Sequence, residues 1–435
     1  MKILLWHGYL LRGSGSNIYT ANIARCWREQ GHDVLVMCQE RDPEVLELVQ
    51  DGPPGPGRCR VRCPDIGRIL PVYVYDRYEG FEAKLFTDLS MEELEAYTER
   101  NVIALVQALE EFAPDAFITG HEVMGPEIAR RACLQTGHRY LAKLHGSALE
   151  YAVKRQDRYA ALARSGLGAA ATIVGGSRYM LNEAAAHIPG WSERGKVVNP
   201  GCDVSLFRPL DRSPGPPRVG FVGKLIASKG VHNLVAALPL MGNRYETTIV
   251  GYGGFEGELQ GLATALQQGD LDAARVLAER GEHGRLPELS DLLADPPAGY
   301  ADAAARMTVH FTGRLEHDPL SRLLPSLDVL VVPSVVPEAF GMVAAEAAAC
   351  GVLPIVPDHS GIGEAGAAVE EAIGRPGFLT FDPADPIRGI AAAVDRVLET
   401  PTAERAPMEA AAVELAHSRW SWDHVARRLL ELAVA

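Results

Sequence analysis

Short apolar stretches rich in β-branched residues alternate along the first half of the chain with longer segments whose apolar residues recur at helical spacing. In residues 17–31, for example, Ile18, Ile23 and Trp27 fall on one side of a helix, and Gly31 supplies a stop signal. Alternating strands and helices favour a parallel sheet that is covered by helices on both faces. The expected strands lie at 2–6, 33–38, 116–120, 140–146 and 172–177.

A second alternating series begins after the proline-rich stretch 208–218, which is typical of a linker between domains. A chain of 435 residues also suits two domains. The pattern therefore predicts an α/β fold with two tandem Rossmann-like domains, 1–207 and 208–417, and a ligand site in the cleft between them. The expected strands of the second domain lie at 218–224, 247–254, 307–313, 328–334 and 352–358.

Two segments depart from this alternation. Residues 254–306 combine many acidic residues with regularly spaced leucines, which predicts a helical insertion of two or three helices in the second domain. The insertion is interpreted as an acidic lid, as an oligomer contact or as a solvent-exposed helical segment without a direct role in function. Residues 418–435 form an expected amphipathic helix with Trp420 and Trp422 near its apolar side.

Composition narrows the classes of function. The formal net charge of −14 argues against a nucleic-acid groove, although a local basic pocket for phosphates stays compatible with it. No uninterrupted apolar stretch is long enough to span a membrane. The seven cysteines are scattered, and the close pair Cys59 and Cys63 lacks further ligands for zinc, so free thiols in a reducing cytoplasm are expected.

The strongest chemical signal lies in residues 333–356, where Glu338 and Glu346 stand eight positions apart. If a helix begins near Gly341, its free N–H groups form an anion site that points into the cleft. Glu338 then lies in the turn before the helix and Glu346 on a wall of the cleft. Either carboxylate suits hydrogen bonds to the vicinal hydroxyls of a hexose or a ribose.

This segment resembles the E-x7-E signature of the large retaining glycosyltransferase family 4, which has the GT-B fold. Three further stretches resemble motifs of the same family in the same order: 199–209, 220–230 and 310–334. The resemblance covers most of the chain apart from 254–306. It implies parallel sheets that face a central cleft, an acceptor-binding first domain completed by the helix 418–435, and a second domain that binds a nucleotide-sugar donor.

Lys224 and Lys229 flank a loop that opens a helix in the second domain, where two ammonium groups can neutralise a diphosphate leaving group. The resemblance implies donor contacts for both, although the family usually has arginine where Lys224 stands. It places Glu338 on the donor sugar and Glu346 on the ribose. The other donor contacts that it implies in these motifs are Gly223, Arg314, Phe340, Gly341, Met342 and Val343.

In the first domain, Gly13, Ser14 and Gly15 follow the first strand and allow the backbone to approach a phosphate or sugar closely. A dinucleotide fingerprint would need glycine where Ile18 stands. Glu40 nevertheless lies near the position of a ribose-binding acid, so an NAD-dependent oxidoreductase remains an alternative. In the family, the glycine loop faces the donor phosphates and the acceptor.

His145 comes at the end of an expected strand, where open α/β sheets expose functional groups. The resemblance implies that His145 contacts the donor sugar. The expected catalytic residues are therefore His145, Glu338, Lys224 and Lys229. Candidate acceptor contacts follow two other strands, with packing or a solvated surface as the competing interpretation. These candidates are His7, Tyr9, Ser16 and Arg178.

The expected reaction is transfer of a hexosyl group, with retention, from a UDP- or GDP-linked sugar to a hydroxyl of a sugar, polyol or glycan. No D-x-D cluster stands in a suitable loop and the lysines can replace a divalent ion, so neither a metal nor another cofactor is expected. The alternatives are a nucleotide-sugar epimerase, a phosphorylase and a non-catalytic binder. Membrane contact is at most peripheral, and the oligomeric state stays open, a homo-oligomer included.

Overall fold

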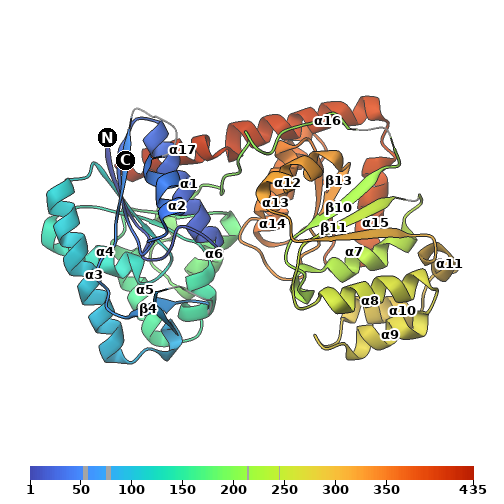
Figure 1. Cartoon of the computed structure of the whole chain (residues 1–435), viewed down its shortest axis with the longest axis horizontal. Coiled ribbons are helices and arrows are strands. Elements are labelled where there is room, and N and C mark those ends of the chain that lie inside the picture. The colour runs from blue at the N-terminus through green and yellow to red at the C-terminus, as the bar shows by residue number, and fades with distance from the viewer. Residues whose placement is uncertain (52–56, 75–79, 213–214, 244) are drawn as a thin grey trace. The chain divides into compact units, whose positions relative to one another are not determined.

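A computed structural model describes residues 1–51, 57–74, 80–212, 215–243 and 245–435. The chain divides into two compact units, Met1–Gly201 with Trp422–Ala435 and Cys202–Ser421 (Figure 1). The apolar pattern predicts boundaries at 207/208 and 417/418 instead. Of the predicted linker 208–218, residues 213 and 214 lie outside the described residues.

The first unit is built on a parallel sheet of seven strands in the order β3-β2-β1-β6-β7-β8-β9. The order reverses between β1 and β6, which pair from Ile3↔Ala116 to Trp6↔Thr119. Ligands of open α/β sheets bind at the carboxyl ends of the strands beside such a reversal. The strands are β1 (Lys2–Trp6), β2 (Asp33–Met37), β3 (Arg58–Arg62), β6 (Ala116–Gly120), β7 (Leu141–Lys143), β8 (Thr172–Gly175) and β9 (Gly195–Val197).

Helices cover both faces of this sheet, as the buried strand residues require. Ile3 and Leu5 join a cluster with α1 (Gly15–Glu29) and α17 (Trp422–Val434), whereas Leu4 and Trp6 are equally buried and alternate with them along the strand. A second layer contains α3 (Met91–Phe112), α4 (Gly125–Thr136) and α5 (Asp157–Ala169). The prediction of a doubly covered parallel sheet is confirmed.

Smaller elements complete the first unit. A two-stranded sheet joins β4 (Ile69–Val72) to β5 (Glu82–Leu85), and α2 (Pro43–Leu46) and α6 (Arg178–His187) follow β2 and β8.

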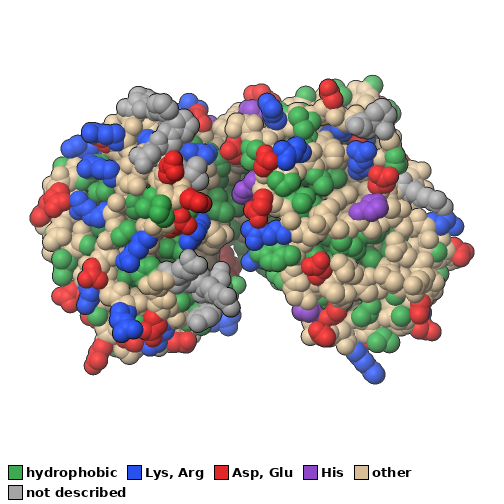
Figure 2. Space-filling view, viewed as in Figure 1, with side chains coloured by type: hydrophobic (Ala, Val, Ile, Leu, Met, Phe, Trp, Pro, Cys, Tyr) green, Lys and Arg blue, Asp and Glu red, His purple; other side chains and the backbone are tan. Residues whose placement is uncertain are grey.

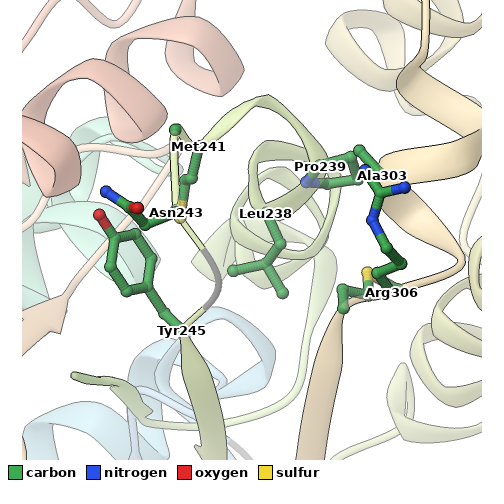
Figure 3. Close-up of a pocket in the computed structure, with 9 residues that line it drawn as sticks. Leu238, Pro239, Met241, Asn243, Tyr245, Ala303 and Arg306 are labelled. Atoms are coloured by element: carbon green, nitrogen blue, oxygen red, sulfur yellow. The ribbon is translucent and has the colours of Figure 1, made fainter. Parts of the chain in front are cut away.

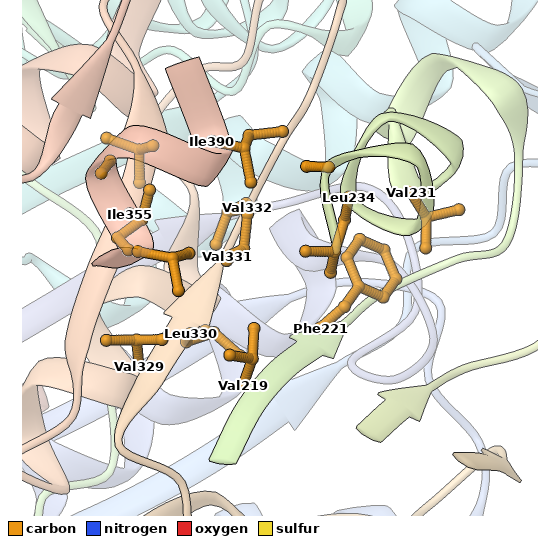
Figure 4. Close-up of a cluster of buried hydrophobic side chains, with 14 of the residues drawn as sticks. Val219, Phe221, Val231, Leu234, Val329, Leu330, Val331, Val332, Ile355 and Ile390 are labelled. Atoms are coloured by element: carbon orange, nitrogen blue, oxygen red, sulfur yellow. The ribbon is translucent and has the colours of Figure 1, made fainter. Parts of the chain in front are cut away.

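The second unit is a parallel sheet of six strands in the order β12-β11-β10-β13-β14-β15. Its reversal point lies between β10 and β13. Figure 4 shows buried apolar side chains of both strands and the flanking helices, mostly aliphatic but with the ring of Phe221 among them. The strands are β10 (Arg218–Val222), β11 (Glu246–Val250), β12 (Thr308–Gly313), β13 (Val329–Val331), β14 (Leu353–Pro357) and β15 (Thr380–Phe381).

Between β11 and β12, a stretch described throughout, the predicted helical insertion contains four helices rather than two or three. They are α8 (Glu256–Gln267), α9 (Leu271–Arg280), α10 (Pro287–Ala294) and α11 (Tyr300–Ala304). Leu259, Leu266 and Leu289 are fully buried in the core of the second unit, so these helices are an integral layer of it. The remaining helices are α7 (Val231–Ala237), α12 (His317–Leu323), α13 (Met342–Ala349), α14 (Ser360–Ile373), α15 (Pro386–Leu398) and α16 (Thr402–Leu415).

Figure 2 shows basic and acidic side chains interspersed over the visible face of each unit. A stripe of like charge that would suit a nucleic-acid backbone does not stand out on that face. No helix in the described residues is long and apolar enough to cross a membrane.

Candidate active site

The loops after β10 and β13 meet at the reversal point of the second sheet. Val335 N–H donates to the carbonyl of Ser228 over 3.0 Å. Gly230 adopts φ +66, and a Cβ atom there would lie 1.9 Å from the carbonyl oxygen of Pro333. Only glycine permits this approach, so the sequence at 230 brings the two loops into contact.

This contact places Lys229 and Glu338 side by side. The Lys229 ammonium donates to Glu338 Oε1 over 2.8 Å, and the two side chains are 31% and 15% exposed. The hydroxyl of Ser334 donates to the same oxygen. Among the described contacts none involves Oε2, so the second oxygen of this carboxylate is the one that a ligand can use. Two residues predicted from separate motifs are thus in direct contact.

The short helix α13 begins directly after this loop. Gly341 is its N-cap with φ +89, and a Cβ atom at Gly341 would lie 2.1 Å from a side-chain carbon of Ile362. Met342 and Val343 are half-buried against the core, and their backbone N–H groups belong to the first turn. The ring of Phe340 is 2% exposed and meets Trp420 edge-on at 5.6 Å. Because that side chain lies in the core, only its backbone is placed for a donor contact.

Glu346 lies on α13, half-buried, beside the thiols of Cys202 and Cys350. Burial raises the pKa of its carboxyl group to about 7. A carboxyl group with a pKa so close to neutrality can be charged or neutral depending on what binds beside it. Such groups are enriched at functional sites.

Three other predicted donor residues surround the same edge of the sheet. Lys224 is exposed, and Gly223 N–H donates to the carbonyl of Val250 over 3.0 Å. Arg314 follows β12, is exposed, pairs with Glu316 at 3.0 Å and lies 5.3 Å over the ring of Tyr252. The site is therefore basic at its rim, which suits a diphosphate.

In the first unit, the glycine loop lies at the N-terminus of α1. Gly13 adopts φ +90 with open space where a Cβ would stand, and Gly15 and the N-cap residue Ser14 are also exposed. The hydroxyls of Ser14 and Ser16 lie 3.2 Å apart. Backbone N–H groups at this helix start are accessible, as a phosphate or sugar contact requires.

His7 and Tyr9, the residues predicted to line an acceptor pocket, are buried in the first unit. His7 is 1% exposed, and both of its ring nitrogens have protein partners, Asn17 at 2.8 Å and Thr20 at 3.2 Å. Burial lowers the pKa of His7 to about 4, so the ring is neutral. Tyr9 is 6% exposed and packs edge-on against His7 and against His121. These contacts favour the packing interpretation of both side chains, and their role as acceptor contacts stays a prediction.

His145 follows β7 and is half-buried, with its ring 4.9 Å from that of His121 and 5.3 Å from that of Tyr19. Burial holds the pKa of His145 well below its usual value, and the nearby histidines act in the same direction. A neutral imidazole can donate or accept a hydrogen bond with a sugar hydroxyl. The position is that expected from the strand end.

The sequence interpretation missed two residues at the end of β6. Glu122 is fully buried and accepts from the N–H groups of His145 (3.0 Å) and Gly146 (2.6 Å), so it holds the loop that carries His145. His121 has φ +70, and its buried Nε2 has no partner among the described residues. Left-handed non-glycine residues of this kind concentrate at functional sites. The signal was available, since both residues follow an apolar strand just as His145 does.

Arg178 begins α6 and is exposed, whereas Ser177 is buried and caps this helix through Met180 N–H at 3.1 Å. Asn199 donates to the carbonyl of Gly176 over 2.9 Å, and Asp203 accepts from the hydroxyl of Ser205 over 2.6 Å. Asn199 and Asp203, on either side of the boundary between the units at 201/202, therefore stabilise loops.

Glu40, the residue that suggests a ribose site of a dehydrogenase, is 1% exposed. Its carboxylate accepts three backbone N–H groups, from Leu11 at 3.0 Å, Arg41 at 3.0 Å and Asp42 at 2.9 Å. A carboxylate in this arrangement organises its own loop and has little capacity left for ribose hydroxyls. Glu40, the main residue in favour of an NAD-dependent oxidoreductase, therefore no longer supports that alternative.

A separate pocket of about 220 Å³ lies at the opposite edge of the second sheet (Figure 3). Tyr245 and Met307 line it and come directly before β11 and β12, at the amino ends of these strands. The carboxylate of Asp395 accepts hydrogen bonds from the Tyr245 hydroxyl at 2.9 Å and from Gly242 N–H at 2.8 Å. The Tyr245 hydroxyl and the Gly242 N–H are thus engaged in the fold. No group of three or more His, Cys, Asp or Glu side chains in the described part of the chain could hold a metal ion.

Comparison with known proteins adds relatives to this geometry. A glycogen synthase of Mycobacterium tuberculosis is 30% identical over 249 residues, 57% of this chain and 50% of that protein. A D-inositol 3-phosphate glycosyltransferase of a Nocardioides species is 31% identical over 257 residues, 55% of this chain and 48% of that protein. The chain spans about half the length of the curated relatives it matches.

Solved structures share the fold over nearly the whole chain. Sucrose-phosphate synthase from Thermosynechococcus elongatus has a TM-score of 0.64 at 19% identity and covers 99% of this chain and 98% of its own. The HepE protein of Anabaena in complex with UDP has a TM-score of 0.63 at 18% identity, with 99% of each chain covered.

Two family models match in order, one in each unit. The model described as a glycosyl transferase 4-like domain matches residues 14–201, and that of glycosyl transferases group 1 matches residues 301–414. With its two parallel-sheet units, this chain belongs to glycosyltransferase family 4 and has the GT-B fold.

Proposed function

We propose that the chain is a retaining glycosyltransferase that moves a hexosyl group from a nucleoside diphosphate sugar to an acceptor hydroxyl. The observation that carries the proposal is the contact of Lys229 with Glu338 at the reversal point of the second sheet, next to the start of α13. A cation, a carboxylate with one free oxygen and a helix start then meet in one place. This set can recognise a diphosphate and a sugar together.

In the proposed reaction, the bond between the anomeric carbon and the diphosphate oxygen breaks while the acceptor oxygen bonds to the same face of that carbon. The acceptor proton passes to a phosphate oxygen of the leaving diphosphate. Lys229, Lys224 and the first N–H groups of α13 stabilise the departing charge. Glu338, through Oε2, orients the sugar hydroxyls.

UDP or GDP is the proposed leaving group, and a sugar, polyol or glycan the proposed acceptor. UDP is supported by the UDP complex of the Anabaena structural neighbour. The curated relatives have different acceptors in their names, so the acceptor is proposed only as a hydroxyl compound. The seven free cysteines suit the proposed cytoplasmic location.

A thermal-shift panel of UDP, GDP, ADP, dTDP and NAD with excess chelator tests the proposal. One nucleoside diphosphate should raise the melting temperature, since a ligand at about 100-fold over its dissociation constant stabilises by roughly 2.7 kcal/mol. We expect the shift and the transfer activity to survive EDTA, because ammonium groups take the place of a divalent ion. A response to NAD alone, or activity that returns only with Mg²⁺ or Mn²⁺, would contradict the proposal.

The pKa of Glu346 predicts that nucleotide binding is linked to pH. Ribose hydroxyls donate to the charged carboxylate, so binding should lower this pKa from about 7 and release a proton near neutral pH. Affinity should therefore rise as the pH increases from 6 to 8. Calorimetry at pH 7 in buffers of different ionisation enthalpy measures the released proton directly.

Glu346→Gln is the matched variant for this measurement. It should abolish the buffer dependence and flatten the pH profile of binding. The substitution should also stabilise the unliganded protein at pH 8 but not at pH 5. The pKa of Glu346 is raised in the folded state, so the wild-type protein loses stability as the pH rises from the pKa of the unfolded chain towards 7. Proton release that persists in Glu346→Gln would assign it to another group.

A further inference from the structure

His359 and Ser360 lie beside the Glu338 loop although neither belongs to the motifs that identify the site. They follow β14, which pairs with β13, after the single residue Asp358, and Ser360 is the first residue of α14. Ser360 adopts φ +52, a left-handed conformation that serine rarely takes. A strained residue persists only where its surroundings hold it, and the Ser360 hydroxyl is held by hydrogen bonds to His359 and Glu338.

The hydrogen bonds of these two residues form a chain with a defined direction. His359 Nε2 lies 3.0 Å from the carbonyl oxygen of Ser334, which can only accept, so Nε2 carries the hydrogen. In the neutral ring Nδ1 then accepts from the Ser360 hydroxyl at 2.9 Å. The Ser360 oxygen in turn accepts the backbone N–H of Glu338 at 3.0 Å. The loop is thus held at its first and last residues, Ser334 and Glu338.

The other side of the Glu338 residue is held by the same segment. Gly361 N–H donates to the Glu338 carbonyl over 2.9 Å. A Cβ atom on Gly361 would lie 2.1 Å from the carbonyl oxygen of Ala339, so this approach depends on glycine. Both backbone groups of Glu338 are therefore fixed by the segment 359–361, while Lys229 and Ser334 fix Oε1.

We infer that His359 and Ser360 are positioning residues that aim Glu338 Oε2 at the sugar of the donor. The inference rests on the proposed function, in which this oxygen binds the sugar hydroxyls. Two hydrogen-bonded residues that touch no ligand themselves would then set specificity for the sugar and leave nucleotide binding unaffected. A displacement of the carboxylate of about 1 Å is enough to impair such a contact.

Ser360→Gly separates this role from a contribution to stability. Glycine adopts φ +52 without strain, which offsets part of the stability lost with the hydrogen bonds of the Ser360 hydroxyl, so the melting temperature should fall only slightly. The link between Glu338 N–H and His359 is lost. We expect the dissociation constant of UDP to stay within about twofold and that of UDP-glucose to rise about tenfold, the effect of losing a hydrogen bond at an oriented group. GDP and GDP-glucose replace this pair if the panel selects GDP.

Two substitutions of His359 complete the experiment. His359→Phe keeps a ring but removes both hydrogen bonds, and should give the same selective loss for the sugar nucleotide. His359→Asn retains an acceptor near Nδ1 for the Ser360 hydroxyl. Its affinity for the sugar nucleotide should therefore lie between those of the wild-type protein and His359→Phe. Equal losses for UDP and UDP-glucose, or no loss for either, would overturn the positioning role alone. Wild-type protein that binds neither ligand pair would overturn the proposed function and, with it, this inference.

Discussion

Replacing Lys229 with alanine should lower the affinity for the nucleoside diphosphate about 10- to 100-fold, since a charge-assisted hydrogen bond contributes roughly 1.5–3 kcal/mol. The rate of transfer should fall further, on the order of 10²- to 10³-fold, because the leaving diphosphate gains charge in the transition state. The measurements are calorimetric titration with UDP and the initial rate of release of UDP from UDP-glucose.

The contact of Lys229 with Glu338 makes a double-mutant cycle the decisive form of this experiment. Loss of the lysine also leaves Glu338 without its cation, so part of the single-mutant effect comes from the carboxylate. In a Glu338→Gln background that part disappears. If the ammonium contacts the diphosphate, Lys229→Ala still weakens UDP binding there.

Lys196→Ala is the control, because this lysine is exposed on β9 in the other unit. It should leave affinity and rate unchanged. An effect of Lys229→Ala that vanishes in the Glu338→Gln background would mean that the lysine only neutralises Glu338. The assignment of a diphosphate contact would then be wrong.

The apolar pattern predicts most of the two sheets because their strands are buried on both faces. A stretch such as 329–331 is apolar at every position, which identifies it without knowledge of the tertiary structure. By contrast β3, Arg58–Arg62, begins inside the proline-rich stretch 51–60, which the sequence predicts as a loop throughout, so the prediction is wrong for 58–60. It lies at the edge of its sheet and alternates buried Cys59 with exposed arginines, so its period is visible only once its partner β2 is known.

The site of the second unit could be predicted further than that of the first. Lys229 and Glu338 lie in motifs that follow strands and occur in the same order along the chain as in the family. Their side chains are in direct contact. His7 lies at a strand end too, yet Asn17 and Thr20 saturate its ring from α1. A strand end predicts where a side chain lies, but not whether a neighbouring helix already satisfies it. The contacts of His359 and Ser360 with the Glu338 loop are likewise tertiary and leave no local signal.

The two tryptophans predicted on one terminal helix lie in different units. Trp420 is fully buried in the core of the second unit, and Trp422 packs in that of the first at 6% exposure. The segment between them is where the chain passes from one unit to the other. Helical periodicity alone cannot reveal this division, because both residues are simply apolar. The completing segment of the first unit is therefore 422–435 and not 418–435.

Deletion of residues 422–435 should unfold the first unit and leave the second folded. Trp422, Val425 and Leu429 of α17 are buried against α1, and Trp27 Nε1–H donates to the carbonyl of Ala426 over 2.9 Å. Each large apolar side chain removed costs roughly 1.5–3 kcal/mol. The sum for this helix is on the order of the whole stability of a domain, about 5–15 kcal/mol.

Limited proteolysis with mass spectrometry measures this outcome unit by unit. Fragments of 1–201 should be digested rapidly in the truncated chain, while 202–421 resists, since it keeps Trp420. Trp422→Ala should weaken the first unit in the same direction. The matched control is Arg427→Ala on the exposed side of α17, where loss of the ion pair with Asp423 should cost less than about 1 kcal/mol. If the first unit of the truncated chain is as resistant as in the full chain, α17 is a surface addition and its burial contributes nothing essential to the fold.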